Sequence, residues 1–121
     1  MKLPGPDHPI TIKPTTERVR VTFNGKVVAD TKRALVLQEA AYKPVFYIPR
    51  QDAQMGLFAR TTNSTHCPYK GDASYYTISV GDRAAENAIW SYETPFPAMK
   101  EIEGHLAFYP NRVDKIEATK A

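Results

Sequence analysis

The chain has 121 residues, of which 42% are hydrophobic and 24% charged, and this size and composition are those of one folded domain rather than a disordered chain. Its single cysteine excludes a disulfide framework and a cysteine-rich zinc site, which fits the reducing cytoplasm. The sequence contains no run of 18 apolar residues and no apolar core of signal-peptide length, so we expect neither membrane insertion nor secretion by a signal peptide.

Residues 1–16 contain four prolines and little periodicity. We expect them to form an extended N-terminal arm, followed by a single β domain that spans residues 17–121. The first predicted strand is Arg18–Phe23, because its apolar and polar residues alternate with the period of a strand.

A tight hairpin is predicted directly after this strand. Asn24-Gly25 favours a type I′ turn, since both central residues of that turn have positive φ. A two-residue turn pairs Phe23 with Lys26. It also places Val21 opposite Val28, which makes one face of the hairpin apolar.

Two short strands and a helical segment are predicted next. The strands are Ala34–Glu39 and Val45–Ile48. The second lies between Pro44 and Pro49, and we place it near a sheet edge or a bulge because proline donates no ladder hydrogen bond. Arg50–Phe58 predicts one or two helical turns.

The segment from Thr61 to Gly71 is interpreted as a loop. Thr61–Thr65 supplies short polar side chains that hydrogen-bond their own backbone, as turn residues do. Thr65–Gly71 gathers the only cysteine, a histidine, a phenol and an ammonium without any strand or helix period. Loops on a rigid framework often carry function, so this segment is the expected location of a site.

The C-terminal half predicts two strands, Ser74–Val80 and Glu86–Tyr92, with a turn at Gly81-Asp82. The remaining elements are a helical turn at Ala98–Ile102 closed by Gly104, a buried strand at Leu106–Tyr109, and a strand or solvated tail at Val113–Ala118. Strands do not alternate with helices, which argues against a parallel α/β sheet. The predicted fold is therefore all-β: a small antiparallel barrel or folded sheet with one or two short helical turns.

Four segments have a distinctive combination of residues: Tyr47–Asp52, Thr65–Tyr76, Ala88–Tyr92 with Pro95, and Ile102–Tyr109. In these segments the chain resembles the bacterial domain of unknown function 427 family, and the resemblance covers Arg18–Ile116. It implies a compact all-β domain, similar in outline to small zinc-bearing β folds but without their cysteine pairs, and no settled function. The family is sometimes labelled nucleotidyltransferase-like, but the sequence has no Gly-rich phosphate loop and no spaced pair of metal-binding aspartates.

Cys67 is the candidate nucleophile. It follows His66 and precedes Lys70, an electropositive setting that favours the thiolate. Neighbouring side chains in an extended segment do not face each other, so a base from elsewhere, such as His105, would be needed. The catalytic candidates are thus Cys67 and His105. The alternative is that Cys67 is a small buried side chain that packs the loop.

The candidate ligand-binding residues fall into a charged and an aromatic group. Lys70, with Arg50 and Tyr69, is placed to bind an anionic group, and the alternative is a solvated lysine. Tyr47, Trp90 and Tyr92 are placed to stack on a planar ligand, and the alternative is that these rings belong to the core. The complete expected set is Tyr47, Arg50, Tyr69, Lys70, Trp90 and Tyr92.

The sequence therefore predicts a cleft over the Cys67–Gly71 loop that binds a small anionic or planar molecule, with binding favoured over catalysis. A nucleic-acid-binding small β barrel is an alternative, but a net charge of +3 with interspersed acidic residues argues against it. A structural domain that forms a homodimer is a third reading. No metal site is predicted, because His66, Cys67 and His105 are too few and too scattered, and no cofactor is expected.

Overall fold

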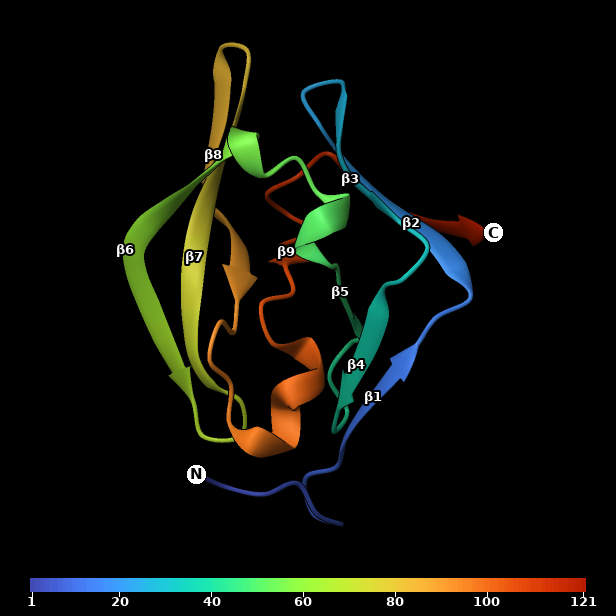
Figure 1. Ribbon diagram of the computed structural model, residues 1–121, viewed down its shortest axis with the longest axis vertical. Helices are drawn as coiled ribbons and strands as arrows, with labels where there is room; N and C mark the ends of the chain where they lie inside the picture. The colour runs from blue at the N-terminus through green and yellow to red at the C-terminus, as the bar shows by residue number, and fades with distance from the viewer.

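The computed structural model describes residues 1–121 and contains ten strands in three antiparallel sheets (Figure 1). The sheets have the strand orders β1-β4-β5, β10-β2-β3 and β6-β7-β8-β9. The strands are β1 (Ile10–Pro14), β2 (Glu17–Phe23), β3 (Lys26–Thr31), β4 (Leu35–Glu39), β5 (Val45–Tyr47), β6 (Phe58–Cys67), β7 (Gly71–Val80), β8 (Arg83–Ser91), β9 (Ala107–Phe108) and β10 (Lys115–Lys120).

The predicted β2–β3 hairpin is present, with a corrected register. Asn24 and Gly25 have φ values of 48° and 78°, as a type I′ turn requires, and Phe23 lies opposite Lys26. The expected pairing of Val21 with Val28 is wrong, because the register shifts next to Val21 and this residue lies opposite Ala29. The irregularity places one extra residue on β3, which is the effect of a β-bulge.

The loop predicted from Thr61 to Gly71 is mostly wrong. β6 continues to Cys67 and β7 begins at Gly71, so only residues 68–70 form a turn, and residues 61–63 lie in β6 at an irregularity in its pairing with β7. β6 lies at the edge of its sheet and most of its residues are exposed. Such a strand needs no apolar face, which explains why its sequence shows no hydrophobic alternation.

Three short 3₁₀ segments connect the strands: η1 (Arg50–Asp52), η2 (Met55–Leu57) and η3 (Pro97–Ile102). The first two fall in the predicted helical segment. The third is closed by Gly104, whose φ is 70°. No helix of this protein is long and apolar enough to cross a membrane.

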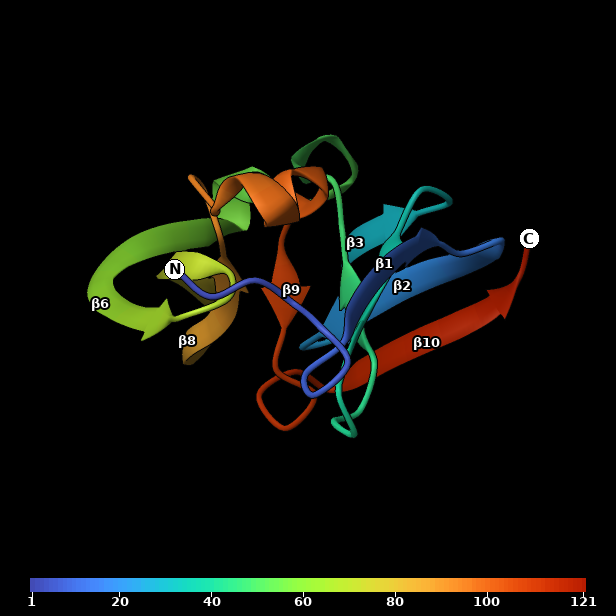
Figure 2. The same cartoon turned by 90° about the horizontal axis from the view of Figure 1, so that it is seen from below.

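The N-terminal residues run across the molecule from the β6–β7 turn to the first strand, as seen from below in Figure 2. The amide of Lys2 donates to the carbonyl of Pro68 over 2.7 Å. Further along, β1 pairs with β4, from Ile10 opposite Glu39 to Pro14 opposite Leu35. The arm therefore lies against two different sheets before β2 begins.

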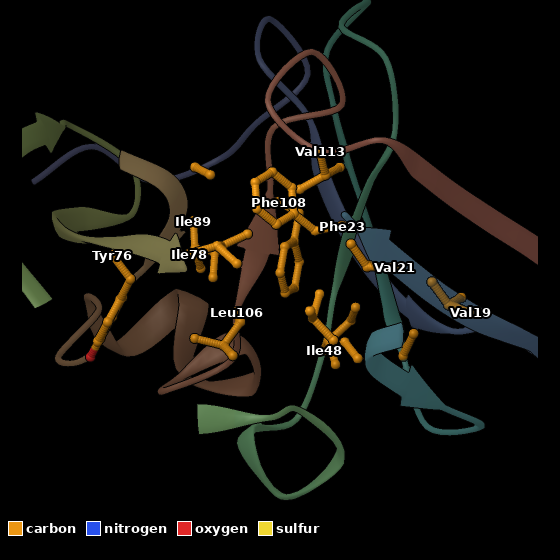
Figure 3. Close-up of a cluster of buried hydrophobic side chains, with 14 residues drawn as sticks. Val19, Val21, Phe23, Ile48, Tyr76, Ile78, Ile89, Leu106, Phe108 and Val113 are labelled. Carbon is orange, nitrogen blue, oxygen red and sulfur yellow. The ribbon is translucent and has the colours of Figure 1, made fainter. Parts of the chain in front are cut away.

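The apolar interior consists of two clusters of buried side chains. The smaller joins Leu37 and Tyr47 of the β1-β4-β5 sheet to Tyr75 and Ala107 of the β6-β7-β8-β9 sheet, and the larger joins the latter sheet to β10-β2-β3. Val21 and Phe23 on one side face Ile78 and Ile89 on the other, and Ile48 lies between them with two residues of the β9 region (Figure 3). A backbone bridge between Ile48 and Leu106 connects β5 to β9, with both N–H···O distances 2.8 Å. The all-β prediction is confirmed, but the sheets keep separate edges and do not close into a barrel.

Candidate functional site

A cavity of about 260 Å³ opens where the β1-β4-β5 sheet meets the β6-β7-β8-β9 sheet. Its lining is mainly aromatic. The aromatic residues are Tyr42, Tyr47, Tyr75, Trp90, Tyr92 and Tyr109. This volume is close to the lower end for small-molecule sites, about 300 Å³, and exceeds the cavity of about 150 Å³ that holds benzene in an engineered protein.

Trp90 on β8 is held by side chains from both sides of the cavity. Its Nε1 donates to the hydroxyl of Tyr47 on β5 over 3.2 Å, and the two rings meet edge to face with centroids 6.3 Å apart. The ring of Tyr109, just after β9, also packs on the indole, with ring centroids 4.5 Å apart. The indole is therefore fixed in place and still borders the open cavity.

Three phenols of this cavity, those of Tyr47, Tyr92 and Tyr109, have raised pKa values. Burial raises the pKa of both Tyr47 and Tyr92 far above the ordinary phenol value. Burial, together with its hydrogen bond to Tyr75, raises the pKa of Tyr109 to about 12. These groups offer hydroxyl protons and aromatic faces at neutral pH, and none of the three is a phenolate that could act as a base.

The polar end of the cavity is an ion pair between Lys70, in the β6–β7 turn, and Glu39, at the end of β4. Lys70 Nζ lies 2.5 Å from Glu39 Oε1, and the side chains are only 10% and 16% exposed. Glu39 Oε2 is 2.8 Å from Nε2 of His8 on the N-terminal arm. Burial alone raises the Glu39 pKa, but the hydrogen bonds from Lys70 and His8 outweigh it and hold this pKa below its usual value.

Lys70 has further contacts that fix its ammonium at the cavity. Nζ lies 3.7 Å from Cys67 Sγ and 5.8 Å from the centre of the Tyr92 ring. The turn holds the lysine in place through its carbonyl, which accepts a hydrogen bond from Phe96 over 3.0 Å. An ammonium has three protons, and Glu39 and Cys67 account for two of them. The third N–H has no hydrogen-bond acceptor within the protein.

Four of the predicted binding residues line this cavity together: Tyr47, Lys70, Trp90 and Tyr92. Arg50 and Tyr69 do not belong to its lining. Neither do the catalytic candidates Cys67 and His105, although Cys67 borders Lys70 from outside the cavity.

Arg50 connects separate elements instead of facing Lys70. Its Nε donates to the carbonyl of Gly104 over 2.6 Å, and its terminal nitrogens reach Tyr76, Ser91 and Glu93 at 3.1, 3.2 and 2.8 Å. Burial alone raises the Glu93 pKa. Hydrogen bonds, chiefly that from Tyr76, outweigh this effect and lower the pKa below its usual value. The guanidinium is thus engaged within the protein.

The remaining candidates, Cys67, Tyr69 and His105, each have a different partner. Tyr69 stacks on His8 of the N-terminal arm, with ring centroids 4.1 Å apart. Nδ1 of His105 lies 3.1 Å from the carbonyl of Glu103 in the same turn, beside a shallow hollow next to Arg50. The polar neighbour of Cys67 is Lys70, so Cys67 and His105 do not form a nucleophile–base pair.

Sequence reasoning predicted four of the eleven residues that line the cavity, and Glu39 and Tyr109 are instructive among those it missed. Glu39 is a single acidic residue at the end of a strand, and nothing near it in the sequence signals its contact with Lys70, 31 positions away. Tyr109 lies in one of the distinctive segments, but its predicted role was only to end a buried strand. Its position beside Trp90 follows from the pairing of β8 with β9.

Three arginines in or next to the β2–β3 hairpin are paired with carboxylates, so they do not form a stripe of free cations of the kind that binds nucleic acid. Arg18 and Arg20 both contact Asp30, and Arg33 contacts Asp52. In addition, the structure contains no group of three or more His, Cys, Asp or Glu side chains that could hold a metal ion.

Comparison with known proteins gives a family assignment. A search of curated proteins found no match. The family model described as "Domain of unknown function (DUF427)" matches residues 11–119, and this range includes every residue that lines the cavity. The chain therefore belongs to the DUF427 family.

Proposed function

We propose that this protein binds a small planar molecule that carries a hydrogen-bond acceptor, in the cavity between β5, β8 and the β6–β7 turn. The observation that carries the proposal is the set of fixed aromatic side chains around an open space of about 260 Å³ with a charged residue pair at one end. Aromatic faces favour stacking with a flat ring over contact with a saturated one. The free proton of Lys70 gives the acceptor a partner.

The ion pair bears on the charge of the ligand. Glu39 is ionised and compensates the charge of Lys70, so the inner part of the cavity offers no uncompensated cation. Lys43, at the exposed rim, is the other lysine of the lining. An exposed charge of this kind contributes up to about 1 kcal/mol, or roughly fivefold in affinity. We therefore expect planarity to decide binding, and a negative charge on the ligand to have a small effect.

The test uses the fluorescence of Trp90, the only tryptophan of the chain and part of the cavity wall. The probes are methyl 4-hydroxybenzoate, its saturated analogue methyl 4-hydroxycyclohexanecarboxylate, and the 4-hydroxybenzoate anion. We expect saturable quenching by the aromatic ester, at least tenfold weaker binding of the saturated ring, and an anion affinity within about fivefold of the ester. Equal binding of the flat and saturated rings, or no binding of the aromatic ester, would contradict the proposal.

Two tyrosine variants test whether the quenching of Trp90 fluorescence comes from binding in this cavity. Tyr42 lines the cavity and is 67% exposed, so Tyr42→Ser removes an aromatic wall with little effect on stability. Tyr69→Ser is the control, because Tyr69 stacks on His8 outside the cavity. We expect the first change to weaken binding of the aromatic ester about threefold or more and the second to leave it unchanged. A preference above 50-fold for the anion would point to an anion site instead.

A further inference from the structure

A second cavity adjoins the proposed ligand site. It measures about 250 Å³, and no charged side chain belongs to its lining. Val21, Ile48 and Phe108 of the main core contribute to it, together with Phe46 of β5 and Ile116 of β10. Figure 3 shows the first three of these side chains around the junction of the sheets.

The two cavities share a wall. Val45 and Trp90 line both of them. The chain passes from one cavity to the next at two further places: Lys43 lines the first and Pro44 the second, and Tyr109 lines the first and Pro110 the second. The cavities therefore lie side by side along the same stretches of chain, with the Val45–Trp90 pair between them.

Their chemical characters differ. The first has the Lys70–Glu39 ion pair and several phenols. The second is lined by aliphatic, proline and aromatic residues. A water molecule in such a space makes few hydrogen bonds, because few polar groups are present to bind it. An apolar group that replaces the water there would gain free energy in proportion to the apolar area buried.

We propose that the second cavity is a subsite for the apolar tail of the ligand, so that the protein selects molecules with a planar polar head and a short alkyl chain. This inference rests on the proposed function, because the head must occupy the first cavity for the tail to reach the second. The tail passes beside Val45 and Trp90 and contacts Phe46 and Ile116. Its expected length is about three or four carbons, in keeping with a space larger than the cavity of about 150 Å³ that holds benzene.

The test is a series of 4-hydroxybenzoate esters, methyl, ethyl, propyl and butyl, titrated against the full chain with Trp90 fluorescence. Burial of one methylene favours binding about three- to fourfold. We therefore expect the affinity to rise at each step, to roughly 30- to 60-fold between the methyl and butyl esters. Equal affinities across the series would overturn the subsite and leave the proposed function standing, whereas failure of the methyl ester to bind would contradict the proposed function itself.

A filling variant separates specific burial from nonspecific attraction. Ile116 is half-buried on the last strand and lines only the second cavity. Ile116→Phe should reduce the affinity for the butyl ester to within about threefold of the methyl ester and leave methyl-ester binding unchanged. Retention of the full gain from the alkyl chain in this variant would overturn the inference, and the unchanged methyl-ester affinity shows that the variant is folded.

A measurement on the wild-type chain gives an independent check. With methyl-labelled isoleucine, the resonance of Ile116 should shift on binding of the butyl ester and much less on binding of the methyl ester. Equal shifts with the two esters would contradict a tail in the second cavity. This result does not depend on the folding of any variant.

Discussion

Lys70 and Glu39 can both be largely buried at the cavity because each compensates the charge of the other. An isolated charge with 10% or 16% exposure would be costly to bury, and each residue supplies the counter-charge of the other. His8 hydrogen-bonds the second carboxylate oxygen of Glu39, and this contact fixes the orientation of the carboxylate. The cavity thus gains a fixed donor from Lys70 while its inner end stays nearly neutral.

The cost of breaking this pair is measurable by a double-mutant cycle. Lys70→Met leaves a largely buried carboxylate without its main partner, so we expect a loss of about 2–3 kcal/mol in the free energy of unfolding. The double variant Lys70→Met, Glu39→Gln should recover at least half of that loss, because the unpaired charge is then gone. Urea denaturation at pH 7 of the wild type, the two single variants Lys70→Met and Glu39→Gln, and the double variant gives the four free energies of unfolding. Additive effects of the two changes would show that the residues do not interact.

The pH dependence of stability should report the same carboxylate. The pKa of Glu39 is lowered in the folded state, so its contribution is fully present above the ordinary value of 4.5 and is lost as the pH falls through the lower folded-state value. The stability difference between the wild type and Glu39→Gln should therefore shrink between pH 5 and pH 3.

The control for this comparison is Glu86→Gln, since the Glu86 side chain is exposed. Its difference from the wild type should stay near zero over the same range. A Glu39 difference that does not change with pH would show that the carboxylate contributes through packing and not through its charge.

At the scale of elements, the β6–β7 turn positions Lys70, and Gly71 makes the turn possible. Gly71 has a φ of +113°, a region that residues with a side chain rarely adopt. A Cβ at this position would lie 3.5 Å from the amide nitrogen of Phe96, which is ordinary contact, so the backbone angle and not the available space requires glycine. The same turn is anchored from the other side, because the Phe96 amide donates to the carbonyl of Lys70.

Gly71→Ala should therefore destabilise the protein through backbone strain, by about 1–3 kcal/mol. Gly56→Ala is the matched control: Gly56 has no positive φ and no atom within 4 Å of an added Cβ, so we expect a change within about 0.5 kcal/mol. Thermal and urea unfolding of both variants give the comparison. Equal effects at the two glycines would contradict the strain argument.

At the scale of the whole molecule, one residue connects the sheets through both its backbone and its side chain. Ile48 exchanges two backbone hydrogen bonds with Leu106, and its fully buried side chain belongs to the larger core cluster, which joins the β10-β2-β3 sheet to the β6-β7-β8-β9 sheet (Figure 3). The separate sheets are therefore expected to unfold together, because none of them covers its own apolar face.

Truncation at this position tests that coupling. Ile48→Ala should cost about 2–5 kcal/mol, and Ile48→Val about 0.5–1.5 kcal/mol, because the first removes more buried carbon and leaves a larger cavity. Circular dichroism and Trp90 fluorescence should report the same unfolding midpoint for each variant. Separate midpoints from the two probes would show that the sheets unfold independently.

Much of the element order was predictable from local patterns. Apolar alternation marked β2 and β7, and Asn24-Gly25 marked a hairpin whose turn has the expected positive φ values. The prediction failed at β6, where an exposed edge strand has no apolar face to alternate. It also failed in the register beside Val21, because a bulge depends on how two strands fit together.

The sequence by itself determined the all-β class and the turns at Asn24-Gly25 and Gly81-Asp82, because period-two alternation and turn chemistry are local properties. It also carried the family resemblance. Only the tertiary structure decided the composition of the site. It brought Glu39 to Lys70 across 31 positions and Tyr47 to Trp90 across 43, and it directed Arg50 to Glu93 and away from the cavity. The physical reason is that alternation shows which side of a strand is buried but not which strand will cover it.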